Sequence, residues 1–268
     1  MKKIALSLIV TLLSVCCFTS CFDNTKRVSE GYTVGIVGTN SKNYVTVLKS
    51  TIGDVYSPSI DALVANGDMY FDNCYAFVYQ MDLSLPENAY DVVEANGYST
   101  ISLLNYSRIP DFRMYSYLTD TSRVLNNEIA LHSAFGTIDF VEDFFFISHT
   151  IYQPSDMTVE WDLSYSPEAI TPTEEYGIRN YDVFIRATKT NDGSQPKAYM
   201  EHLVAYKIDR FFKDAALNEK NSLGANYNEQ SSVFTVRFNF PSEVDENNQT
   251  IRWQRTTLGF PIASFIEQ

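Results

Sequence analysis

The chain has 268 residues, and its 20 Lys and Arg stand against 33 Asp and Glu, for a formal net charge of −13. This length suits one large or two modest domains. The apolar fraction of 45% is that of an ordinary globular protein and excludes full disorder and a polytopic membrane protein. A chain this acidic gains nothing from counterion release at a phosphate backbone, so nucleic acid is not expected as a partner.

The first twenty residues have the features of a signal peptide. Lys2 and Lys3 supply a positive start, and residues 4–18 are almost wholly apolar. That run is shorter than the roughly 20 residues of a transmembrane helix. It leads into Phe18-Thr19-Ser20-Cys21, which resembles a bacterial lipobox, and residues 21–30 follow as a polar tether.

Cys21 is the expected lipidation site. In lipobox signals the cysteine becomes the new N-terminus and carries acyl chains, and each buried CH₂ contributes about 0.8 kcal/mol to membrane binding. The alternatives are a secretory leader cut near Ser20 and an uncleaved anchor. Past Cys21 only Cys74 remains, so no intrachain disulfide framework exists, and Cys74 is expected to be a small buried strand residue.

The elements of residues 31–106 predict a small OB-like barrel with one short helix. β-branched and aromatic runs indicate strands. Ser57-Pro58 starts the helix, and Asn66-Gly67 ends it. Three strands, a helix and two strands form the element order of an OB barrel. The expected strands cover residues 32–37, 44–48, 55–56, 69–81 and 90–93, the last continuing toward Leu104.

Residues 107–268 predict a β-sandwich, with the boundary in the polar stretch of residues 105–111. Strict alternation over residues 156–165 indicates a strand with one wet face, and residues 140–151 are apolar on both faces. Such a combination is typical of two packed layers. Further expectations are a hairpin that joins residues 181–187 to 198–208 through the turn at 191–194, a helical turn at 211–218, and a last hairpin of 233–240 with 250–257.

The catalytic inventory of the sequence is poor. His132, His149 and His202 do not have the spacing of zinc ligands, and with one cysteine in the mature chain a thiolate zinc site is excluded. His202 is expected to be a hydrogen-bonded core residue. Ser133 and Ser148 adjoin histidines, but sequence neighbours on a strand face opposite ways, so no catalytic triad is indicated. No catalytic residue, metal or cofactor is therefore assigned.

Carboxylates are the one abundant catalytic group. Glu160 and Asp162 share one face of a predicted strand, and a glycosidase needs two carboxylates roughly 5–10 Å apart in a cleft. A solvated strand face that protects an edge from aggregation explains the same pattern more simply.

Exposed aromatic rings could stack on sugars or on a partner protein. Tyr106, Tyr115 and Tyr117 cluster near the interdomain segment. Trp161 and Trp253 share strand faces with aliphatic residues, which favours a place in the core.

Several segments of the sequence form a further pattern: Cys21 with Asp23-Asn24, Gly53-Asp54-Val55-Tyr56-Ser57-Pro58, Gly67-Asp68, the strand at 75–80, residues 89–96, residues 183–189 with Asn191-Asp192-Gly193, and residues 204–208. In these segments the sequence resembles the NigD-like lipoproteins of Bacteroidetes. The resemblance implies an OB-like domain followed by a β-sandwich, and it implies no catalytic residues.

These observations predict a lipid-anchored protein of the cell envelope, in the outer membrane, facing the periplasm or the cell surface. It is expected to act as a non-enzymatic binding or structural module for an envelope protein or a glycan. One alternative is a carbohydrate-active hydrolase that uses Glu160 and Asp162. Another is a fimbrillin-type pilus or adhesin subunit, for which residues 250–266 would supply a strand for donation.

Overall fold

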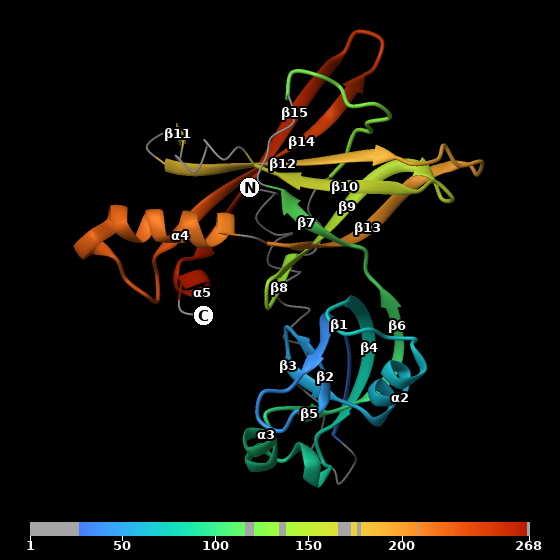
Figure 1. The fold of residues 1–268 in the computed structure, drawn as a ribbon, viewed down its shortest axis with the longest axis vertical. Helices are drawn as coiled ribbons and strands as arrows, with labels where there is room; N and C mark the ends of the chain where they lie inside the picture. Colours follow the sequence, from blue (N-terminus) through green and yellow to red (C-terminus); the bar gives the residue numbers. More distant parts are fainter. Residues whose placement is uncertain are drawn as a thin grey trace, which may run out of the picture.

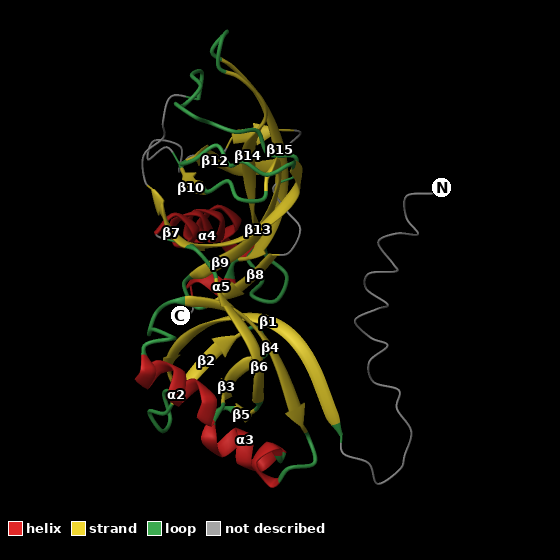
Figure 2. Cartoon of the chain, turned by 90° about the vertical axis from the view of Figure 1, so that its right-hand side faces the viewer, coloured by secondary structure: helices red, strands yellow, loops and turns green. Residues whose placement is uncertain are grey.

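The chain forms two β-rich units stacked along the long axis of the molecule (Figures 1 and 2). The computed structural model describes residues 27–115, 121–133, 138–165, 173–175, 178–208 and 210–266. The predicted leader and Cys21 lie outside these ranges. No helix within them is long and apolar enough to span a membrane.

The first unit is a curled six-stranded sheet in the order β5-β3-β2-β1-β4-β6. Its central strand, β1, pairs antiparallel with β2 and β4, and β3 pairs parallel with β5. Val37, Leu48 and Phe77 lie in the core that the sheet encloses. The strands are β1 (Val28–Thr39), β2 (Thr46–Ser50), β3 (Gly53–Tyr56), β4 (Cys74–Asp82), β5 (Ser99–Thr100) and β6 (Ser102–Arg108).

The helix predicted in this unit is confirmed as α2 (Pro58–Asn66). The Ser57 side chain accepts a hydrogen bond from the Ser59 N–H, which caps the helix. Gly67, at φ 77°, donates its N–H to carbonyls of the last turn. Because a left-handed backbone strains other residues, this position favours glycine.

The strand predicted at residues 90–93 is wrong. These residues begin a second helix, α3 (Tyr90–Asn96), preceded by the 3-10 turn η2 (Pro86–Asn88). Gly97 ends α3 at φ 78°, and its N–H bonds the Val93 carbonyl at 2.7 Å. Adjacent valines favour strands, but a four-residue run cannot show whether the apolar period is 2 or 3.6.

The second unit is a nine-stranded sheet, in which β15-β14-β12-β10-β7-β13-β9-β8 run in order and β11 joins β12. Its strands are β7 (Asp111–Tyr115), β8 (Ile138–Val141), β9 (Phe144–Pro154), β10 (Val159–Ser164), β11 (Thr173–Glu175), β12 (Ile178–Lys189), β13 (Lys197–Lys207), β14 (Val233–Asp245) and β15 (Thr250–Pro261).

This sheet curls until its two halves face each other over one core. β7 joins the halves, because it pairs parallel with β10 on one side and with β13 on the other. Across the core, the His149 and Trp161 rings stack with centroids 4.4 Å apart, and the Phe145 and Phe238 rings lie 5.6 Å apart. The mainly β fold is confirmed, and the two layers of the second unit are halves of one continuous sheet.

The hairpin predicted at residues 191–194 is wrong. β12 pairs with β10 and β14, whereas β13 pairs with β9 and β7. The turn therefore carries the chain from one layer to the other. Turn residues such as Asn191-Asp192-Gly193 mark a reversal, but they do not determine which strand the next one joins.

Helices close one end of the second core. The short helical turn predicted at 211–218 is a full helix, α4 (Arg210–Leu223), and it buries Phe211, Phe212, Ala215 and Ala216. The 3-10 turn η4 (Gly224–Asn226) follows it, and α5 (Ala263–Ile266) packs Phe265 against Phe212. In Figure 1, α4 lies at the opposite end of the sheet from the turn between β12 and β13.

The two units share a third apolar cluster. The chain crosses between the sheets at Ile109 and Pro110. Buried residues of both units meet there: Val34, Ile36, Cys74, Ala76 and Ile109 from the first side, and Val141, Phe144, Phe146 and Ala205 from the second. Cys74 is fully buried, as predicted.

Candidate functional site

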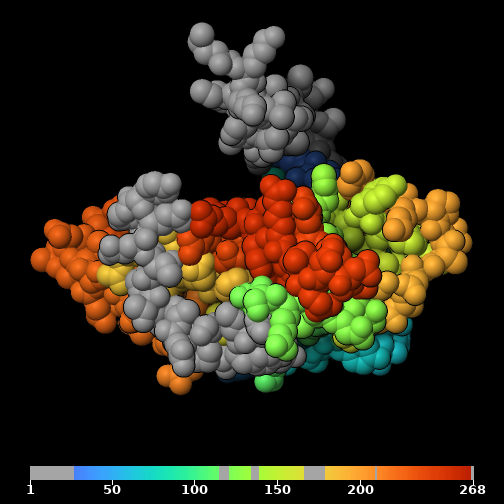
Figure 3. Space-filling view, turned by 90° about the horizontal axis from the view of Figure 1, so that it is seen from above, coloured from blue at the N-terminus to red at the C-terminus, as the bar shows by residue number. Residues whose placement is uncertain are grey.

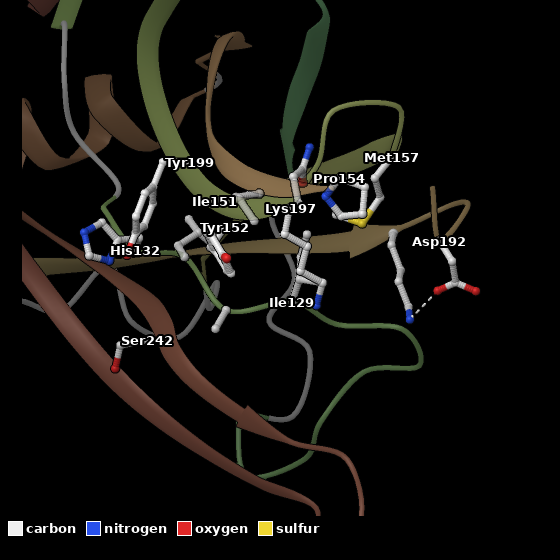
Figure 4. Close-up of a pocket in the computed structure, with 14 residues that line it drawn as sticks. Ile129, His132, Ile151, Tyr152, Pro154, Met157, Asp192, Lys197, Tyr199 and Ser242 are labelled. Carbon is white, nitrogen blue, oxygen red and sulfur yellow. Dashed lines mark hydrogen bonds and ion pairs between the residues drawn. The ribbon is translucent and has the colours of Figure 1, made fainter. Parts of the chain in front are cut away.

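A trough of about 560 Å³ opens at the end of the second unit away from α4. We call it the tyrosine trough. Its walls come from residues 129–132, from the adjoining ends of β9 and β13, and from the turn after β12 (Figure 4). The lining residues are Ile129, Ala130, Leu131, His132, Ile151, Tyr152, Gln153, Pro154, Met157, Lys189, Asp192, Lys197, Tyr199 and Ser242.

One wall bridges the two halves of the sheet. The Ile129 N–H bonds the Ala187 carbonyl of β12, and the Leu131 N–H bonds the Pro241 carbonyl of β14. The N–H of His132 then bonds the Thr150 carbonyl of β9 at 2.9 Å. Seen from above, the segment of residues 121–133 (green) lies beside the β14–β15 hairpin (red) in Figure 3. The wall is therefore fixed at both ends by backbone hydrogen bonds.

A buried ion pair anchors the start of this segment. Arg186 of β12 and Glu128 are both fully buried at their side chains. The guanidinium donates Nε and Nη2 hydrogen bonds to the two Glu128 carboxylate oxygens, each at 2.6 Å. Arg186 also donates to the Arg123 carbonyl, and its cation lies 5.5 Å from the Trp253 ring centroid. A bidentate pair with further partners satisfies both charges.

Aromatic rings form one end of the trough. Tyr199 of β13 and Tyr152 of β9 are direct cross-strand partners, with ring centroids 5.1 Å apart. The His132 ring also contacts the Tyr199 ring, and their centroids lie 4.7 Å apart. The tyrosines are 62% and 57% exposed, which leaves their rings open to a ligand.

Charged side chains lie toward the other end. The Lys189 ammonium donates to Asp192 at 2.6 Å, the contact dashed in Figure 4. The turn that carries Asp192 is held by Asp156, which accepts hydrogen bonds from the backbone N–H groups of Ser194 and Gln195. These bonds lower the pKa of the Asp156 carboxyl to about 2.

Gln153 follows Tyr152 on β9, so its side chain points to the opposite, inner face of the strand. Gln153 is 2% exposed, and its Nε2 donates to His202 Nε2 at 2.9 Å. Burial lowers the pKa of His202, which is consistent with a neutral ring that accepts this bond. His202 is hydrogen-bonded, as predicted, but it is partly exposed rather than a core residue. Gln153 Oε1 has no hydrogen-bond partner among the described residues.

The two carboxylates predicted for a hydrolase do not lie in the trough. Glu160 is exposed, while Asp162 is partly buried on the outer face of β10, opposite Arg186. Burial raises the pKa of Asp162 to about 6, and the Arg186 charge opposes that shift. Within the described ranges, no three His, Cys, Asp or Glu side chains come together as a metal site. The trough presents aromatic rings and charged side chains.

Other residues singled out from the sequence take structural places. Trp161 is buried in the second core, as predicted, whereas Trp253 is half-buried on the outer face and donates to the Thr121 carbonyl. Tyr106 packs edge-on against Tyr75. The Tyr115 side chain and Tyr117 lie outside the described residues. β15, the strand considered for donation to a pilus partner, is paired with β14 from Thr250 to Pro261.

The tyrosine trough was not predicted from the sequence. Tyr152 and Tyr199 are 47 positions apart, and no local pattern brings them together. The available signal was that Tyr199 falls on the polar face of its predicted strand, where a large aromatic residue has no packing role. Recognising the pair needed the register of β9 against β13, which the sequence does not state.

Comparison with known proteins identifies the first unit. Residues 25–107 match the family model described as "Lipoprotein OB domain". The first unit is therefore similar to a lipoprotein OB domain. The predicted OB-like barrel is confirmed, and the likeness to a lipoprotein domain agrees with the predicted lipid-anchored place in the cell envelope. A search of curated proteins found no match.

Solved structures share the fold of the whole chain. An uncharacterised protein of Parabacteroides merdae matches with a TM-score of 0.71 at 16% identity, covering 87% of this chain and 99% of that one. A protein of Bacteroides fragilis described as a lipoprotein matches at 0.52 and 10% identity, covering 85% and 97%. A NigD-like immunity protein of Bacteroides caccae matches at 0.41 and 7% identity, covering 87% and 94%. At these low identities, the likeness to the first two proteins shows a shared fold and no more.

Proposed function

We propose that this protein is a non-enzymatic binding module of the cell envelope, anchored by acyl chains on Cys21, and that it binds a glycan in the tyrosine trough. The observation that carries the proposal is the open pair of rings, Tyr152 and Tyr199, in a trough lined by polar side chains. A sugar offers an apolar C–H face for stacking and hydroxyls for hydrogen bonds. The tyrosine rings suit the apolar face, and side chains such as Lys197 and Ser242 suit the hydroxyls.

Binding to a glycan array tests the trough. The full-length protein, purified in detergent, is expected to retain a subset of envelope and host oligosaccharides, and Tyr199→Ala is expected to weaken that binding about tenfold, equivalent to about 1.4 kcal/mol. Tyr44→Ala is the matched control, because Tyr44 is 82% exposed in the first unit. Retention of no glycan, or equal loss in both variants, would contradict the proposal.

The anchor is tested separately. Cells fed an alkyne-bearing palmitate analogue are expected to label the wild-type protein and not Cys21→Ala. The wild-type protein should enter the detergent phase of a Triton X-114 separation, and the variant should stay in the aqueous phase. Labelling that survives the substitution would place the acyl chains elsewhere.

A further inference from the structure

We propose that the ligand of the tyrosine trough is an acidic sugar, a uronic acid residue whose carboxylate pairs with Lys197. This inference rests on the proposed function and specifies its ligand class. It comes from the net charge of the side chains that line the trough, which is positive, whereas the net charge of the whole chain is negative.

Among the residues that the structure describes, one cation of the trough has no anionic partner. Two lysines and one aspartate line it, and Asp192 pairs with Lys189 at 2.6 Å. Within the described part of the chain, Lys197 makes no ion pair and no side-chain hydrogen bond. The chain has a formal net charge of −13. An uncompensated lysine in the cavity of so acidic a protein provides a local attraction for an anion.

Lys197 is placed to reach a group on a sugar stacked at Tyr199. Both residues lie on β13, two positions apart, so their side chains leave the same face of the strand. Two residues of strand rise span about 7 Å. Figure 4 shows Lys197 between the His132–Tyr199 end and the Asp192 end. A uronic acid stacked on the Tyr199 ring can therefore direct its carboxylate along the strand toward the ammonium.

The form of the trough favours this ligand over other anions. A volume of about 560 Å³ suits a small molecule of a few rings, within the roughly 300–1,000 Å³ usual for such sites. Phosphate sites generally use arginine forks, several cations or a helix N-terminus. Within the described ranges, the trough offers one free ammonium, which matches a group that bears a single negative charge.

The experiment compares acids with their neutral methyl esters. Trimers of galacturonate and of mannuronate and a glucuronate-containing heparosan tetrasaccharide, each with its methyl ester, are titrated into the full-length protein in detergent. At least one acid is expected to bind about tenfold more tightly than its ester at 50 mM NaCl. The difference should shrink at 1 M NaCl because salt screens the charge pair.

Variants assign the effect to Lys197. Lys197→Gln should bind acid and ester alike, and Lys197→Arg should keep the preference for the acid. Lys213→Gln is the control, since Lys213 is exposed on α4 at the far end of the unit. If acids and esters bind equally and Tyr199→Ala abolishes both, the acidic ligand is wrong and the glycan function stands. If no saccharide binds to the wild-type protein, both proposals fail.

Discussion

At the scale of single residues, burial disfavours the charged form of the Asp162 carboxyl. It lies opposite Arg186 in the β10–β12 pairing, and one of its carboxylate oxygens is buried without a hydrogen-bond partner among the described residues. Arg186 cannot compensate it fully, because Glu128 already occupies the guanidinium. Burial therefore dominates and raises the pKa of Asp162 to about 6.

The raised pKa predicts that Asp162 lowers the stability of the folded protein as the pH rises. The pKa of this carboxyl is about 6 in the folded protein and about 4 in the unfolded chain. Its protonated form therefore contributes to stability below about pH 4, and this contribution is lost as the pH rises through about 6. Asp162→Asn should therefore gain stability relative to wild type between pH 4 and pH 7, by about 1–2 kcal/mol after solvent screening. Urea unfolding at both pH values measures this, with Glu160→Gln on the same strand face as the control. A constant difference across this range would contradict the assignment.

Asp156 has the opposite sign and a role in the trough. Its pKa is lowered to about 2, first by the Gln195 N–H and then by Ser194, so its contribution to stability is present above the unfolded pKa of about 4 and is lost as pH falls through about 2. Asp156→Asn should unfold at a lower temperature at pH 7 and at the wild-type temperature near pH 2.

The same variant should weaken ligand binding, because the turn it loosens carries Asp192 and leads to Lys197. Gly193 in this turn has φ 67°, and a Cβ there would lie 2.7 Å from Asp156. Asp245→Asn is the control, since Asp245 holds the β14–β15 turn in the same way and lies outside the trough. Equal loss of binding in both variants would mean that the effect is not local.

At the scale of elements, the segment of residues 121–133 is a loop that backbone hydrogen bonds and one buried ion pair fix to the sheet. Removing a partner from a buried pair leaves an uncompensated charge and costs about 3–5 kcal/mol. Glu128→Gln should lower the free energy of unfolding by that amount and also weaken glycan binding, because Ile129, Leu131 and His132 follow directly. Glu243→Gln breaks an exposed pair with Arg252 and should cost less than about 1 kcal/mol. Chemical denaturation and titration of each variant check both statements.

The elements also show what the sequence can and cannot predict. The α2 helix was predictable because its caps, Ser57 and Gly67, are local signals. The alternation around Trp161 likewise placed that ring in the core. α3 and the partners of β12 were not predictable, because they depend on which distant segments pack together. The trough combines four segments that are distant in the chain, so the sequence showed its single residues but not that they form one site.

At the scale of the whole molecule, the shared cluster determines whether the units behave as one. Cys74 of the first unit and Phe146 of the second are both fully buried there, alongside Ala205. Each unit alone would expose this apolar surface, which costs roughly 25 cal/mol per Å². The two units are therefore expected to unfold in a single cooperative transition, as a pair with a common core does.

Cys74 offers a direct measurement of that coupling. Burial raises the pKa of its thiol, so it should resist a maleimide reagent until the cluster opens. A fragment of residues 22–268 keeps every described residue, and Cys74 is its only cysteine. Both tryptophans, Trp161 and Trp253, lie in the second unit and report on its unfolding. Wild-type labelling should follow the loss of tryptophan signal in urea.

Two core substitutions then separate local opening from global unfolding. Phe146→Ala empties part of the shared cluster and should cost about 3–5 kcal/mol, with labelling of Cys74 that precedes the change in tryptophan fluorescence. Phe238→Ala removes a ring of the same burial from the second core, away from the interface, so its labelling and fluorescence should still change together. Early labelling of the wild-type protein would show that the OB domain separates from the second unit before either unfolds. The units would then be independent, and the trough would not depend on the OB domain for its stability.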